Sequence, residues 1–110
     1  MTGVKILIVE DDKSTSLILE QLLLKKNYQI TNIVTSGEDA INSITKNRPH
    51  IVLMDLHLAG EIDGIQTAEI INQTNPIPIV FISSFGDHKA LLESKINQSF
   101  TFLLKPVNEN

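Results

Sequence analysis

The 110-residue chain contains no cysteine. It therefore has no disulfide framework, no thiolate chemistry and no zinc site built on cysteine. It also lacks an excess of positive charge, because 9 lysines and arginines stand against 13 acids and the formal net charge is −4. A chain without a basic footprint is not expected to bind nucleic acid directly.

Long apolar runs are missing as well. No run approaches the roughly 18 residues needed to span a membrane. The N-terminus has no basic region followed by a long apolar stretch, so no signal peptide is predicted. We expect a cytoplasmic protein without a membrane partner. The length is near the commonest domain size, and the sequence predicts one domain over residues 1–110.

Apolar runs alternate with amphipathic stretches along the whole chain, without repeats or low-complexity segments. The pattern predicts strands over residues 4–9, 28–34, 50–55, 79–83 and 100–104, and helices over residues 14–26, 36–47, 64–73 and from Asp87 to about 96. The strand over 28–34 alternates apolar and polar residues, which is typical of a half-exposed strand at a sheet edge. The alternating order of strands and helices predicts an α/β fold with a parallel sheet and helices on both faces.

Helix starts are marked by short polar residues. Asp12 is expected to cap the first helix, whose inner face is predicted to include Leu17, Ile18 and Leu22. The second and third helices carry the spacing of a capping box, in which a cap residue and the side chain three positions later bond to each other's backbone. These pairs are Ser36 with Asp39 and Asp63 with Gln66.

Polar residues gather where the predicted strands end. Glu10 and Asp11 follow the first strand, Asp55 and Ser83 close two buried strands, and Lys105 follows the last. The carboxyl ends of parallel strands meet at one edge of the sheet, and sites in such sheets form there. Three acids and a lysine at one edge predict a site for a hard metal ion and a phosphoryl group.

Each of these signals is weak when taken alone. An acid after a strand is more often a helix cap or part of a solvated turn than a metal ligand, and Asp12 is expected to be such a cap. Independent caps would not all lie at the same edge of the sheet. The convergence therefore carries the prediction, and Mg²⁺ is the cation that oxygen ligands and a phosphoryl group favour.

The chain resembles the receiver domain of two-component response regulators from Ile6 to Pro106. The matching segments are Ile-Val-Glu10-Asp11-Asp12, Met-Asp55, Asp63-Gly64, Ile82-Ser83-Ser84 and Lys105-Pro106, in this order. The resemblance implies a flavodoxin-like, doubly wound sheet of five parallel strands in the order 2-1-3-4-5. It also implies a phosphorelay, in which a phosphohistidine on a sensor histidine kinase or a histidine phosphotransfer protein is the phosphoryl donor.

The resemblance assigns a role to each acid at the sheet edge. Asp55 would be the phosphoacceptor. Asp11 would bind Mg²⁺ directly, Glu10 would act through water or outside the first ligand shell, and the backbone carbonyl of His57 would be the third protein ligand. The His57 side chain is expected to point to solvent, because Mg²⁺ prefers oxygen to nitrogen.

The resemblance also implies a conformational switch. Lys105 would bind the phosphoryl group, Ser83 would be the switch hydroxyl, and Phe102 would be the aromatic residue that changes rotamer. The domain would take part in its own phosphotransfer and autodephosphorylation without being a turnover enzyme. The Lys105–Pro106 bond would be cis.

The segment between Asp55 and Gly64 departs from the commonest receiver sequence. It is one residue longer, contains a glycine and lacks the usual proline. Two other functions are weighed beside the receiver. A haloacid-dehalogenase-like Mg²⁺-dependent phosphatase also forms a phosphoaspartate, but it needs Asp-x-Asp on the first strand. A phosphorylation-independent interaction module would keep the fold without the chemistry.

Four residues follow the Lys105–Pro106 pair, too few for the fifth helix that receivers have at this point. We expect that helix to be absent or truncated, which would leave an apolar patch over the last two strands. Either a longer parent chain supplies the helix, or a homodimer or output partner covers this C-terminal face.

Overall fold

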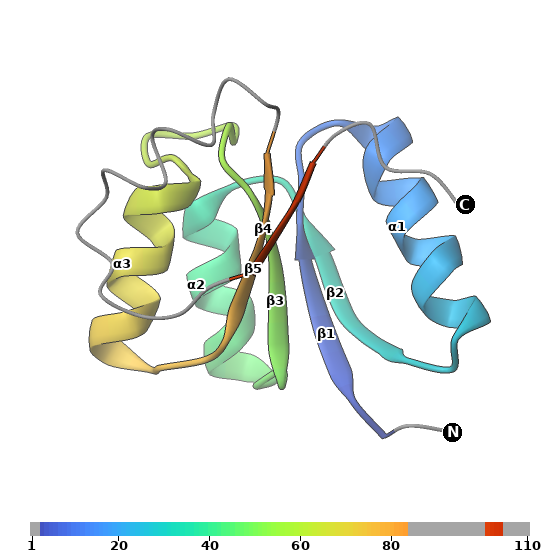
Figure 1. Cartoon of the computed structure of the whole chain (residues 1–110). Helices are drawn as coiled ribbons and strands as arrows, with labels where there is room; N and C mark the ends of the chain where they lie inside the picture. The colour runs from blue at the N-terminus through green and yellow to red at the C-terminus, as the bar shows by residue number, and fades with distance from the viewer. Residues whose placement is uncertain (1–2, 84–100, 105–110) are drawn as a thin grey trace.

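The computed structural model describes the backbone of residues 3–83 and 101–104 and the side chains of residues 3–82 (Figure 1). Its strands are β1 (Lys5–Val9), β2 (Gln29–Val34), β3 (Ile51–Asp55), β4 (Ile79–Ser83) and β5 (Thr101–Leu104). Its helices are α1 (Lys13–Lys25), α2 (Gly37–Lys46) and α3 (Gly64–Thr74). All four neighbouring strand pairs are parallel, in the order β2-β1-β3-β4-β5. The predicted α/β fold and strand order are confirmed.

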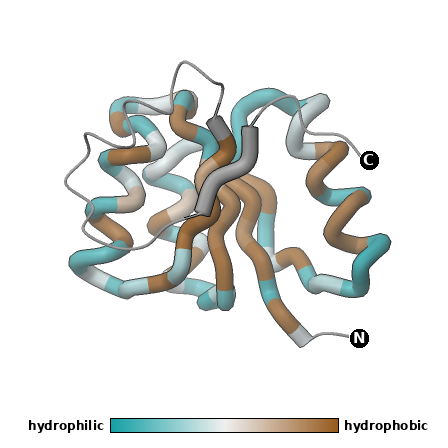
Figure 2. The backbone as a smooth tube through the Cα atoms, in the orientation of Figure 1, coloured by the Kyte–Doolittle hydropathy of each residue, from teal (hydrophilic) through white to brown (hydrophobic). Residues whose placement is uncertain are grey.

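Helices cover both faces of the sheet, with α1 on one side and α2 and α3 on the other (Figure 1). Alternate residues of the central strands supply the two cores, because successive side chains of a strand point to opposite faces. Leu7, Val52 and Met54 pack on the side of α2 and α3. Ile8 and Leu53 pack on the side of α1. Burial on both faces explains why the central strands are continuous apolar runs (Figure 2).

Three predicted caps begin the three helices. The Asp12 carboxylate accepts a hydrogen bond from the amide of Ser14, at 3.3 Å, at the start of α1. At α2 the Ser36 hydroxyl accepts from the amide of Asp39, which is one of the two hydrogen bonds of the predicted capping box. At α3 both hydrogen bonds of the capping box that begins at Asp63 are present. Short polar side chains thus fix where the chain turns from each strand end into the next helix.

The predicted inner face of α1 is wrong at one position. Leu17 is 49% exposed and Leu24 is 53% exposed, whereas Leu19 is buried. Ile18 and Leu22 are partly buried, as predicted. Six apolar residues lie between positions 17 and 24, which is more than one side of a helix can bury against a single sheet face.

The edge strand β2 contains an irregularity in its pairing with β1. Ile6 pairs with Ile30, but the next residue pairs with Asn32, so Thr31 is an extra residue in β2. The amide of Ile33 donates to the side-chain oxygen of the preceding Asn32, at 2.9 Å. The prediction of a half-exposed edge strand is confirmed, because β2 mixes exposed and partly buried residues and only Val34 is buried, although exposed and buried residues do not alternate strictly.

Several predictions concern residues outside the described part of the chain. The helix from Asp87, the Lys105–Pro106 bond and the absence of a fifth helix are among them, and so are the side chains of Ser83 and Phe102. Among the helices of the described residues, none combines the length and apolar character that membrane crossing requires.

Candidate functional site

Three acids converge at the carboxyl edge of the sheet because β1 and β3 are neighbours. Glu10, Asp11 and Asp55 each place a carboxylate oxygen within 4.8 Å of the others. Glu10 is 1% exposed and Asp55 is 2% exposed, whereas Asp11 is exposed. The cluster therefore has a buried floor of two carboxylates and one acid at its mouth.

The chain leaving β1 is held by hydrogen bonds around Glu10. The Glu10 amide donates to the carbonyl of Val34 at 2.9 Å, which extends the pairing with β2 past the strand end. The Glu10 carboxylate accepts from the amide of Asp12 at 3.1 Å. Asp12 in turn caps α1, so the tight turn from strand to helix fixes the direction of both Glu10 and Asp11.

Asp55 is the last residue of β3 and lies opposite Ile82 of β4. The amide of His57 approaches the Asp55 carboxylate at 3.4 Å, a long hydrogen bond. The amide of Gly64 donates to the carbonyl of Leu56 at 2.9 Å. A Cβ atom at position 64 would collide with the backbone carbonyl oxygen of Asp55, so glycine lets α3 begin directly against the end of β3.

The loop between β3 and α3 is joined to the start of α2. Ser36 and Ala59 form an isolated parallel bridge. The amide of Glu61 donates to the carboxylate of Glu38 at 3.0 Å. This hydrogen bond, together with one from the Glu38 backbone, lowers the pKa of Glu38 below its ordinary value. The His57 side chain is exposed, as predicted.

Of the other predicted site residues, Ser83 and Phe102 have a described backbone. Ser83 is the last residue of β4 and pairs with Leu104, the last residue of β5. Lys105 follows Leu104 in the chain but lies outside the described residues. The backbone of Phe102 pairs with Phe81. Their roles stay predictions, because their side chains are not described.

The donor set suits a hard cation. All three side chains that converge offer carboxylate oxygens, and two of them are buried. Oxygen ligands are those that Mg²⁺ and Ca²⁺ take, and Mg²⁺ commonly uses one or two carboxylates with water and phosphate oxygens. Carboxylates this close repel one another unless a cation or a proton intervenes. Residues Glu10, Asp11 and Asp55 therefore fit Mg²⁺.

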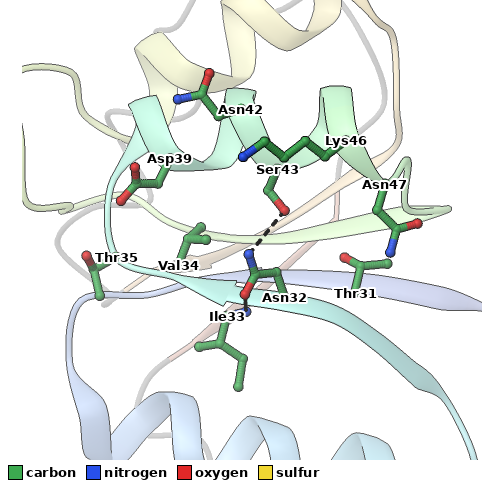
Figure 3. Close-up of a pocket in the computed structure, with 10 residues that line it drawn as sticks. All are labelled: Thr31, Asn32, Ile33, Val34, Thr35, Asp39, Asn42, Ser43, Lys46 and Asn47. Atoms are coloured by element: carbon green, nitrogen blue, oxygen red, sulfur yellow. Dashed lines mark hydrogen bonds between the residues drawn. The ribbon is translucent and has the colours of Figure 1, made fainter.

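Two hollows in the described part of the chain border the edge strand β2, and one of these lies beside the acids. One of about 300 Å³ borders Glu10 and Asp11 and is also lined by Leu17 of α1. The other, of about 550 Å³, lies between β2 and α2 and none of the three acids lines it. In this second hollow the Asn32 amide approaches the Ser43 hydroxyl at 3.5 Å (Figure 3). Only the first hollow opens toward the acidic cluster.

The sequence analysis missed the role of Glu38. Its contact with Glu61 joins residues 23 positions apart, and no periodicity or cap pattern in the sequence points to it. The extra residue and the glycine in the loop before Gly64 were visible in the sequence, but they did not point to a contact with Glu38.

Comparisons with known proteins agree on one family. A family model described as the response regulator receiver domain matches residues 6–110. Sporulation initiation phosphotransferase F of Bacillus subtilis is 31% identical over 109 residues, which cover 96% of this chain and 85% of that protein. The transcriptional regulatory protein ZraR of Salmonella typhimurium is 33% identical over 106 residues. A two-component response regulator of Oryza sativa subsp. japonica is 28% identical over 109 residues.

The chain spans only 24% and 17% of the length of the last two proteins. Solved structures give the same result. The signal receiver domain of a modulated diguanylate cyclase from Desulfovibrio desulfuricans has a TM-score of 0.87 and 32% identity, over 97% of this chain and 85% of that one. The receiver domain of the response regulator PhyR from Erythrobacter litoralis has a TM-score of 0.83 and 27% identity, over 97% and 81%.

Proposed function

Because the chain belongs to the response regulator receiver domain family, we propose that Asp55 accepts a phosphoryl group from a phosphohistidine. The donor is a sensor histidine kinase or a histidine phosphotransfer protein, the partners with which receiver domains interact. Receiver domains are signalling switches, and this one signals downstream through a change of conformation. The convergence of Glu10 and Asp11 with Asp55 is the observation that carries the proposal.

The transfer is an in-line displacement at phosphorus. A carboxylate oxygen of Asp55 forms the new O–P bond while the P–N bond to the donor histidine breaks, and the histidine nitrogen leaves with the electron pair. Hydrolysis returns Asp55 to its starting state. Water attacks the phosphorus, the O–P bond to Asp55 breaks, and the carboxylate is restored with release of inorganic phosphate. The chain takes part in both steps without turning over a separate substrate.

Glu10, Asp11 and Asp55 would hold Mg²⁺, with the carbonyl of His57 as a further oxygen ligand. When bound, this ion offsets negative charge on the acids and on the transferred group. The chain's own contribution is to keep the acids in place. The amide of His57 lies 3.4 Å from one Asp55 oxygen and helps to orient the carboxylate that would attack the phosphorus.

Lys105 and Ser83 complete the site in the proposal. Ser83 closes β4, which is the neighbour of β3 in the sheet, and Lys105 follows β5, the next strand along. Lys105 would supply positive charge to a phosphoryl oxygen and Ser83 a hydroxyl donor. Movement of Ser83 toward the phosphoryl group would leave space for Phe102. The charge added at Asp55 would thus shift the domain between two conformations.

The donor protein would approach at the mouth of the cluster. Asp11 is exposed there, and the adjoining hollow is lined by Leu17, which is 49% exposed. An exposed leucine beside a site that must admit a protein-bound phosphohistidine offers an apolar contact to the partner. We also propose one receiver domain over residues 1–110 and a cytoplasmic location.

The two other functions are less well supported. A haloacid-dehalogenase-like phosphatase needs its paired acids on the first strand, whereas Asp55 ends β3 and is followed by Leu56 and His57. A phosphorylation-independent interaction module would not require three acids to converge with two of them buried. A homodimer or output partner at the C-terminal face stays a prediction that falls on residues outside the described part.

Phosphorylation can be tested with a small phosphodonor and Mg²⁺, followed by intact-mass and peptide mapping. We expect one phosphoryl group on Asp55 in the wild-type chain and none in Asp55→Asn. Asp12→Asn is the matched control, because it removes the same charge near the cluster while asparagine still caps a helix well. Comparable labelling of Asp55→Asn would refute the assignment.

A further inference from the structure

The loop between Asp55 and Gly64 has few internal means of holding its shape. Among its central residues, His57, Ala59, Gly60 and Glu61 are exposed, and only Leu58 and Ile62 are partly buried. Exposed loop segments with little apolar burial open at low free energy. The contacts made with the start of α2 must therefore provide much of the order of this loop.

Two of those contacts lie next to each other. Ala59 forms its bridge with Ser36, directly before α2. Two residues later, the amide of Glu61 donates to the carboxylate of Glu38 in the first turn of α2, at 3.0 Å. A hydrogen bond to an ionised carboxylate is among the stronger ones that a peptide amide can make.

Gly60 lets the loop backbone come close enough to Glu38 for the hydrogen bond from Glu61 to form. Its φ angle is +95°, a conformation that side chains rarely adopt, and a Cβ atom at this position would lie 2.7 Å from a carboxylate oxygen of Glu38. The backbone at position 60 therefore passes directly against the carboxylate. This glycine belongs to the segment that is one residue longer than the commonest receiver loop.

We propose that Glu38 is a positioning residue for the phosphorylation site, which it serves by fixing the loop that carries His57. The inference rests on the proposed function of Asp55. The loop begins at Asp55, whose carboxylate faces the amide of His57. The backbone carbonyl of His57 is the proposed third oxygen ligand for Mg²⁺. Fixing residues 59–61 to α2 therefore limits where the His57 peptide can lie relative to Asp55.

A second reason for an acid in this turn is its favourable interaction with the helix N-terminus. Asp39 shares that property, since it is exposed and lies in the same turn. Glu38 is distinguished by its contact with the loop. Comparing variants at the two positions separates positioning of the loop from stabilisation of α2.

The test uses the full chain with Glu38→Ala, Glu38→Gln and Asp39→Ala. Magnesium affinity is measured by titration, and hydrogen exchange is followed at the Glu61 amide. We expect Glu38→Ala to weaken Mg²⁺ binding by roughly fivefold, below the usual loss for an outer-shell ligand because the effect passes through the loop. Glu38→Gln keeps an acceptor oxygen and should stay within about twofold of wild type, as should Asp39→Ala.

Phosphorylation rates give a further readout. For Glu38→Ala, saturating Mg²⁺ should return the labelling rate of Asp55 close to that of wild type, since the carboxylate itself is intact. The Glu61 amide should exchange faster in Glu38→Ala than in Asp39→Ala at equal thermal stability. Equal Mg²⁺ affinities and equal Glu61 exchange in these two variants would overturn the inference. Absence of label on wild-type Asp55 would instead refute the proposed function.

Discussion

Replacing Asp55 by asparagine should make the metal-free protein more stable. The change is nearly isosteric, and the side-chain oxygen can still accept from the amide of His57. It removes one of three carboxylates whose oxygens lie within 4.8 Å of one another, two of them in buried residues. Only the charge of the cluster changes, so the difference in stability reports the repulsion among the acids.

The size of that repulsion follows from the separation. Two unit charges 4.8 Å apart interact by about 3.5 kcal/mol at an effective dielectric constant of about 20. Water around the exposed Asp11 screens its share, and the proposed Lys105 offsets part of the rest. We therefore expect Asp55→Asn to raise the free energy of unfolding without metal by about 1–2 kcal/mol, or the midpoint of thermal unfolding by roughly 5–10 °C.

Magnesium should narrow the difference in stability between the two proteins. An ion at ten times its dissociation constant stabilises a folded protein by about 1.4 kcal/mol. The wild-type chain should gain this amount, whereas Asp55→Asn, which lacks one ligand, should gain clearly less. Bound metal and the asparagine thus relieve the same repulsion by different means, and their effects should not add.

The assay is urea unfolding followed by far-UV circular dichroism, in a chelator and in saturating Mg²⁺. Asp12→Asn is the control, because it removes one charge two residues from Glu10 and keeps the cap of α1. The reasoning is refuted if Asp55→Asn is less stable than wild type in the chelator. It is also refuted if Mg²⁺ stabilises both proteins equally.

Three further predictions concern the surroundings of the site. Gly64→Ala should lower the free energy of unfolding by about 1–3 kcal/mol despite the better helix propensity of alanine, since the new Cβ atom meets backbone that cannot rotate away; chemical unfolding checks this. Asp11→Ala should weaken Mg²⁺ binding more than Asp12→Ala, which should instead lose about 1 kcal/mol of stability through its cap; equal losses of affinity would contradict the assignment. The hydrogen bond of Glu38 should be present at neutral pH and be lost as the pH falls through its lowered pKa, so the NMR shift of the Glu61 amide should change more on acidification in wild type than in Glu38→Gln.

The strands could be predicted because buried parallel strands are continuous apolar runs whose carboxyl ends share an edge, whereas the strand order was implied by the resemblance to receiver domains. The same rule indicated that Asp11 and Asp55 would meet, and their carboxylates do. The buried side of α1 could not be fixed. Leu17 and Leu19 are equally apolar, and only the position of the sheet decides which of them is covered.

The support of the loop after β3 was also beyond prediction. A hydrogen bond between Glu38 and Glu61 depends on how two separate crossovers place their ends, which no local pattern encodes. The caps at Asp12 and Asp63 were predictable for the opposite reason, because each cap contacts residues within its own first turn. Local chemistry was accessible from the sequence, whereas contacts between crossovers required the fold.

The extra residue in β2 affects whether a strand of another molecule can pair with this edge of the sheet. Edge strands expose unpaired backbone groups that can recruit a strand from another molecule and start aggregation. Since Val34 accepts from Glu10 toward β1, the ladder's alternation turns the amide of Ile33 outward. That amide is already bonded to the side chain of Asn32, and the insertion of Thr31 distorts the strand just before it. An incoming strand would therefore meet a distorted edge at the middle of β2, where the Ile33 amide is already bonded, and this disfavours the addition of a second copy of the chain along this side.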